Sequence, residues 1–245
     1  MLNRQNFAEE EHQPILNLPP VVVMCLAVLF GIHIGRVFLL SPDADFDLVL
    51  RFAFIPLRVI EPEAIGTAVP GGFGAAVWSF VTYAFLHADW THVIFNGLWL
   101  AAFGAPLAWR FGTSRFLLFS LLGAVAGALL HFLVNMHDIQ PMIGASAAIS
   151  AQMAGASRFV FSAGGPLAGT RSPATFSRPA APLSVIMRDR NVLMFLGVWF
   201  GLNILFGLIG MGMGSGAQAI AWEAHIGGFL AGLLAFSLFD PVPRA

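Results

Sequence analysis

Six apolar segments recur along this chain, each about 20 residues long and separated from the next by a polar connection. They cover residues 18–40, 91–109, 116–136, 142–161, 192–211 and 219–239. About 20 apolar residues in a helix cross the hydrocarbon core of a bilayer. Inside that core only helices and closed barrels satisfy their own backbone hydrogen bonds. The pattern therefore predicts an all-α polytopic membrane protein with a bundle of six transmembrane helices.

The composition supports a membrane protein. Of the 245 residues, 58% are hydrophobic and 10% are charged, whereas soluble domains are about 45–50% apolar and about 25% charged. The net charge of −1 gives no sign of a polyanion-binding surface, so a nucleic-acid partner is not expected. The single cysteine, Cys25, excludes an internal disulfide and a cysteine-based metal site.

The arginines predict the orientation, because loops on the cytoplasmic side of a membrane carry an excess of basic residues. All 12 basic residues are arginine, and a cytoplasmic N-terminus leaves only Arg36, Arg51 and Arg58 on the outer side. The expected segments are a cytoplasmic tail (1–17), a six-span domain (18–240) that contains an amphipathic outer loop (41–74) and a cytoplasmic linker (162–191), and a C-terminal tail (241–245).

Ser146 stands in a setting of very small side chains. It follows Gly144, which permits unusual backbone conformations, and it begins a stripe of Ala147, Ala151 and Gly155 that favours close helix packing. Taken alone, a serine in a transmembrane helix usually bonds only to the carbonyl four residues earlier. The small neighbours make the hydroxyl of Ser146 a candidate nucleophile.

His225 lies in the last apolar segment, and Gly228 and Gly232 follow it as a small-xxx-small pattern. A structural histidine within the bundle is one interpretation. If this helix packs against the Ser146 helix, the imidazole can accept the hydroxyl proton as the serine attacks. Glu223 is about 200° around the helix from His225, so the sequence predicts a Ser–His dyad without an evident acidic third member.

His92 and Asn96 are four residues apart and share one helical face, from which both could donate hydrogen bonds to an oxyanion. The competing interpretation is a metal site built from His87, His92 and His225. No His-Glu-x-x-His pattern is present, and no carboxylate lies on the His92 face to orient a ligand. The oxyanion interpretation is favoured, with no metal, nucleotide or other cofactor implied. His33 and His131 are interpreted as structural residues.

Four motifs, taken in this order, resemble the rhomboid family of intramembrane serine proteases. The first motif is Trp78 together with residues 82–87, and the others are residues 87–96, 144–146 and 224–232. The resemblance as a whole covers about residues 21–240. The resemblance implies that Ser146 is the nucleophile and His225 the general base. It also implies an oxyanion hole made by His92, Asn96 and the Ser146 N–H, with His87 and Gly144 as structural residues beside the site.

The implied function is that of a serine endopeptidase that cleaves transmembrane segments of membrane proteins within the lipid bilayer. A bacterial inner membrane is expected, with the site toward the outer face. The alternative is a non-catalytic rhomboid-like protein that binds transmembrane clients. The chain departs from the family pattern at four positions. Ala147 stands where the family commonly has glycine, and Ser79 where it has arginine. Ala108 stands in place of an acidic residue, and Ser150 in place of an aromatic one.

Overall fold

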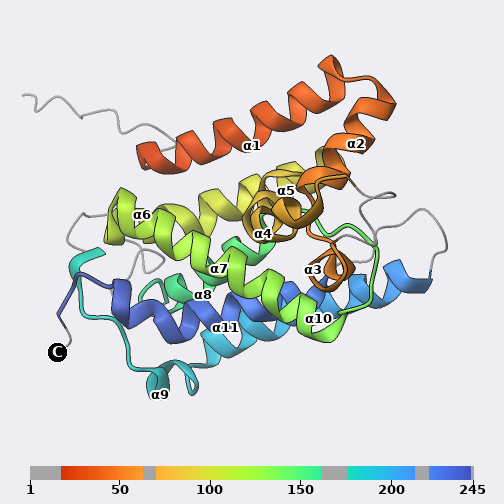
Figure 1. Ribbon diagram of the computed structural model, residues 1–245. Helices are drawn as coiled ribbons and strands as arrows, with labels where there is room; N and C mark the ends of the chain where they lie inside the picture. Colours follow the sequence, from red (N-terminus) through yellow and green to blue (C-terminus); the bar gives the residue numbers. More distant parts are fainter. Residues whose placement is uncertain (1–17, 63–69, 162–175, 213–220, 244–245) are drawn as a thin grey trace, which may run out of the picture.

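The computed structural model describes residues 18–62, 70–161, 176–212 and 221–243. The predicted tail at 1–17 and parts of the predicted loop, linker and C-terminal tail therefore lie outside the described residues. The described chain is a helical bundle, as the six apolar segments predict (Figure 1).

Four helical stretches are long and apolar enough to cross a membrane. They are α1 (Pro20–Leu39), the continuous stretch Trp90–Phe111, α7 (Thr113–Val134) and α11 (Trp222–Phe239). The stretch Trp90–Phe111 consists of α5 (Trp90–Trp99), a π-helical turn η2 (Leu100–Gly104) and α6 (Ala105–Phe111). The fourth and fifth predicted spans correspond to α8 (Ser146–Ser157) and α10 (Arg190–Gly212).

The prediction of a fourth span over residues 142–161 was too long, since α8 has only 12 residues. Met142 pairs with Phe54 in an isolated antiparallel bridge, and Gly144 has a φ of 122°, so the chain before Ser146 is not helical. At 1.5 Å per residue, α8 is about 18 Å long, against a hydrocarbon core of about 30 Å. A helix of this length is too short to cross the hydrocarbon core by itself.

The segment predicted as an amphipathic outer loop contains α2 (Pro42–Phe52) and α3 (Pro56–Ile60), and α4 (Gly72–Thr82) begins at its end. Arg58 is fully buried and donates to the carbonyls of Leu50 and Ala53. Thr82 Oγ1 donates to the Phe52 carbonyl over 2.7 Å, which ties α4 to the end of α2. Hydrogen bonds from the side chains of Arg58 and Thr82 to backbone carbonyls thus fix the conformation of this loop.

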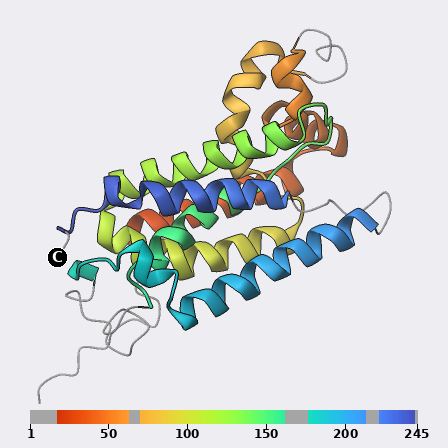
Figure 2. The same cartoon turned by 90° about the horizontal axis from the view of Figure 1, so that it is seen from below.

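Helices α7, α8 and α11 form the centre of the bundle. Gly228 and Gly232 of α11 face the backbone of α8 at Ala147 and Ala151, so closely that a Cβ atom at either glycine would collide with it. Close backbone approach of this kind is what small-residue repeats permit in membranes. Figure 2 shows α10 at one edge of the bundle and α7 on the opposite side of α11 from α10.

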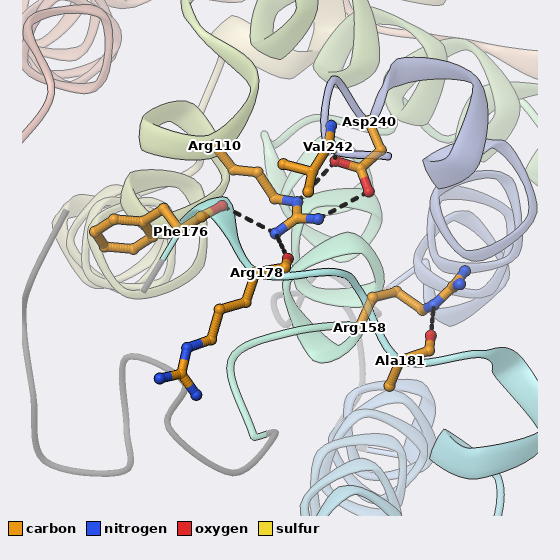
Figure 3. Close-up of polar contacts among 7 residues, drawn as sticks. All are labelled: Arg110, Arg158, Phe176, Arg178, Ala181, Asp240 and Val242. Atoms are coloured by element: carbon orange, nitrogen blue, oxygen red, sulfur yellow. Dashed lines mark hydrogen bonds and ion pairs between the residues drawn. The ribbon is translucent and has the colours of Figure 1, made fainter. Parts of the chain in front are cut away.

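Two buried arginines, Arg110 in the last turn of α6 and Arg158 at the end of α8, make polar contacts near the C-terminal end of α11 (Figure 3). Arg110 donates to both carboxylate oxygens of Asp240 over 2.8 and 2.9 Å, and to the carbonyls of Phe176 and Arg178. Arg158 Nε donates to the Ala181 carbonyl over 2.8 Å. These bonds attach the segment before α9 (Leu183–Ile186) to the ends of α6 and α8, and the Arg110–Asp240 pair ties α6 to the end of α11.

Candidate active site

Ser146 is the first residue of α8, directly after a tight backbone turn. The N–H of Gly144 donates to the Tyr83 carbonyl over 3.0 Å, and its φ of 122° is one that residues with a side chain rarely adopt. A Cβ atom at Gly144 would also lie 2.7 Å from His92 Nε2. Glycine is therefore required here both by the turn and by the neighbouring imidazole.

His225 lies in the first turn of α11, and its Nε2 is 2.7 Å from Ser146 Oγ. This distance is within the range for proton transfer between a nucleophile and its base. The imidazole is buried, whereas Ser146 is partly exposed. For the hydroxyl to donate, Nε2 must be unprotonated, and the neutral ring then carries its proton on Nδ1. The structure thus brings together the two residues that the sequence singled out.

His92 is held in one orientation by the turn before α5. Asp89 caps this helix by accepting from the His92 N–H over 2.8 Å, and the Ala88 N–H donates to His92 Nδ1 over 3.4 Å. Because Nδ1 accepts, the neutral ring carries its proton on Nε2. That nitrogen is the one that lies against Gly144. His92 therefore presents a donor beside the turn that carries Ser146.

Asn96 is buried on the same face of α5, one turn after His92. Its Nδ2 donates to the His92 carbonyl over 3.0 Å, so one of its two amide N–H groups bonds within the helix. The backbone N–H groups in the first turn of α8 have no partner inside the helix and lie at the positive end of its dipole. The free N–H groups of α8 begin at Ser146, and the His92 ring lies against the turn just before it.

His87 lies in the loop before α5 and is fully buried, with its ring edge-on to that of His92 at 4.9 Å between centroids. Burial lowers the pKa of His87 to about 3, so its ring is neutral at physiological pH. Its carbonyl accepts from Arg36 Nη1 over 2.8 Å, and Arg36 also pairs with both carboxylate oxygens of Asp45. The loop beside His92 is thus fixed to α1 and α2.

Glu223, two residues before His225 on α11, directs its carboxylate to residues at the end of α7. Its carboxylate accepts from Asn135 Nδ2 over 3.2 Å and lies 3.7 Å from His131 Nδ1. His33, the other histidine interpreted as structural, is buried edge-on against Trp90. Within the described ranges, no group of three or more His, Cys, Asp or Glu side chains is arranged to hold a metal ion.

The four residues that depart from the family pattern are packed against, or hydrogen-bonded to, neighbouring parts of the bundle. The Ala147 side chain is almost fully buried, and a Cβ at Gly127 of α7 would collide with its methyl group. The methyl group therefore points into the helix packing and does not narrow the space at Ser146. Ser150 donates to the Ser146 carbonyl over 2.7 Å, and Ser79 and Ala108 are buried.

Two residues near the site were missed by reasoning from sequence. Arg36 supports the loop that carries His87, and Trp199 of α10 has its ring 5.8 Å from that of His225. An arginine within an apolar segment is a usable signal for a buried polar anchor. An aromatic residue in an apolar helix carries no such signal, since most of its neighbours are apolar as well.

Comparisons with known proteins agree with the architecture. The family model described as the Rhomboid domain matches residues 74–240, which is more than half of the chain and includes both Ser146 and His225. Proteins named rhomboid protease GlpG, from Yersinia pestis (strain Pestoides F) and Yersinia pseudotuberculosis serotype O:3 (strain YPIII), are 28% identical over 160 residues.

These 160 residues are 64% of this chain and 46% of each relative, so the match spans about half the length of those curated relatives. The predicted resemblance is confirmed at the level of the family. The chain is an integral membrane protein and belongs to the rhomboid family.

Proposed function

We propose that this protein is a serine endopeptidase that cleaves transmembrane segments of other membrane proteins through Ser146 and His225. The observation that carries the proposal is the 2.7 Å contact between Ser146 Oγ and His225 Nε2. Membership of the rhomboid family and the word protease in the names of the relatives support it.

The reaction begins when Ser146 Oγ attacks a substrate carbonyl while its proton passes to His225 Nε2. The carbonyl oxygen becomes an oxyanion, which the Ser146 N–H, His92 Nε2–H and the second amide N–H of Asn96 stabilise. His225 then gives its proton to the leaving amine, and the peptide bond breaks to leave an acyl-serine. A water molecule, deprotonated by His225, attacks the acyl carbon, and the proton returns to Ser146 as the acid is released.

The short α8 helix supports a site below the membrane surface. At about 18 Å it spans only part of a hydrocarbon core of about 30 Å, and Ser146 is its first residue. A transmembrane substrate must unwind locally to expose a carbonyl, because an intact helix keeps its carbonyls hydrogen-bonded. Substrates with helix-breaking residues near the cleaved bond are therefore expected to react faster.

The distribution of arginines supports a cytoplasmic N-terminus, and with it a site that opens toward the outer face of a bacterial inner membrane. Residues 1–17 and 162–191 would then be a tail and a linker on the cytoplasmic side. A protease-protection assay on membrane vesicles, with a tag at the N-terminus, tests this orientation.

The decisive test compares Ser146→Ala and His225→Ala with wild-type protein in proteoliposomes that contain a reporter transmembrane substrate. Ser157→Ala, at the other end of α8, and His137→Ala, on an exposed loop, are the matched controls. Both site variants should lose cleavage while both controls keep it. Full activity in either site variant would refute the mechanism, and inactivity of the wild type would favour the client-binding alternative.

A further inference from the structure

Helix α10 contacts the bundle through aromatic side chains. Phe195 lies 5.4 Å from the ring of Phe103, while Trp199 and Phe200 lie 6.3 and 5.1 Å from that of Phe229 on α11. The opposite side of the helix is exposed, for example at Val198. The aromatic face of α10 is therefore its attachment to the neighbouring helices.

Trp199 differs from its neighbours because its ring also contacts the imidazole of His225. The two ring centroids are 5.8 Å apart with an angle of 45° between the planes. Phe229 lies one turn after His225, so the indole covers both rings on one side of α11. Centroid separations of 4.5–7 Å are those at which aromatic pairs attract one another.

The imidazole acts as a base only while Nε2 faces Ser146 Oγ, and rotation about its side-chain bonds would end that contact. The carboxylate of Glu223, two positions earlier, accepts from Asn135 and lies near His131 at the end of α7. We propose that Trp199 is a positioning residue, whose indole limits the rotation of His225 and keeps Nε2 directed at the serine. This inference rests on the proposed function.

The test measures the rate at which a small fluorophosphonate probe labels the purified protein in detergent. Labelling requires the serine and its base, but does not require a transmembrane substrate to enter between helices. Trp199→Leu removes the ring and keeps an apolar side chain, and should slow labelling roughly three- to tenfold, the factor associated with one aromatic pair. Trp199→Phe keeps a ring and should stay within about twofold of wild type.

Phe200→Leu is the matched control, because Phe200 contacts Phe229 and Trp199 rather than His225. Its labelling rate should equal that of wild type. With a transmembrane substrate, Trp199→Leu should lower kcat and leave KM nearly unchanged.

Unchanged labelling in Trp199→Leu, or an equal loss in Phe200→Leu, would overturn the proposal, as would a rise in KM alone. If Trp199→Leu does not fold, the comparison of Trp199→Phe with Trp199→Tyr replaces it, and a tenfold loss in both ring-bearing variants would overturn the proposal. Failure of the wild type to label would instead count against the proposed function, so the two failures are distinguishable.

Discussion

Replacing Gly228 by alanine should separate the two halves of the dyad. A Cβ atom at Gly228 would collide with the Ala147 carbonyl oxygen and would lie 2.8 Å from its carbonyl carbon. Ordinary contact begins near 3.4 Å, so clearing the carbonyl carbon takes a shift of about 0.6 Å between α11 and α8, and clearing the closer oxygen takes about 1 Å or more. Even the smaller of these shifts, if it acts along the line between the two residues, would lengthen the 2.7 Å contact between Ser146 and His225 to about 3.3 Å, beyond the range for efficient proton transfer.

A misplacement of about 1 Å at a catalytic group costs roughly a hundredfold in rate. For Gly228→Ala we therefore expect kcat to fall at least about tenfold, together with a loss of about 1–3 kcal/mol in stability from overpacking. The assay is cleavage of a reporter transmembrane substrate, measured below the thermal midpoint of each variant. Gly31→Ala is the control, since nothing lies within 4 Å of its added Cβ atom. Wild-type activity in a folded Gly228→Ala variant would show that close helix approach does not set the dyad geometry.

Three further substitutions test other parts of the account. Ala147→Gly should lower stability by about 1–2 kcal/mol without raising activity, because the methyl group packs toward Gly127; thermal unfolding and cleavage rates check this, and a clear gain in rate would refute it. Gly144→Ala should abolish cleavage in a protein that still forms the bundle, and wild-type rates would contradict the strained turn. Arg110→Gln should cost about 3–5 kcal/mol, because Asp240 would remain buried without its partner, and an unchanged melting midpoint would contradict that reasoning.

Much of the helical architecture follows from hydropathy and small-residue spacing. The apolar segments around 18–40 and 116–136 correspond to α1 and α7, and the repeat from Gly228 to Gly232 does bring α11 against α8. These features were predictable because a membrane span requires about 20 apolar residues, and close helix packing requires small residues at regular spacing.

The ends of α8 were not predictable in the same way. Hydropathy extends the segment to residues 142–161, but the bridge from Met142 to Phe54 and the backbone of Gly144 stop the helix at Ser146. The bridge depends on a residue almost 90 positions earlier in the chain, and the backbone of Gly144 depends on a torsion angle. Neither leaves a periodic pattern.

The polar contacts between distant segments also needed the structure. Glu223 has its partners at the end of α7, at His131 and the capping residue Asn135, and no spacing along the sequence links these residues. The pairing of Ser146 with His225 was foreseen because each lies among small residues that allow close approach. The contact of Trp199 with that pair was not, since apolar helices contain many aromatic residues.

The central claim is that Ser146 is a nucleophile activated by His225. The most direct measurement is mass-spectrometric mapping of the adduct formed by a fluorophosphonate probe on the membrane-embedded protein. We expect one adduct, on Ser146, that is absent in Ser146→Ala and strongly reduced in His225→Ala. An adduct on another residue, or undiminished labelling in His225→Ala, would contradict it.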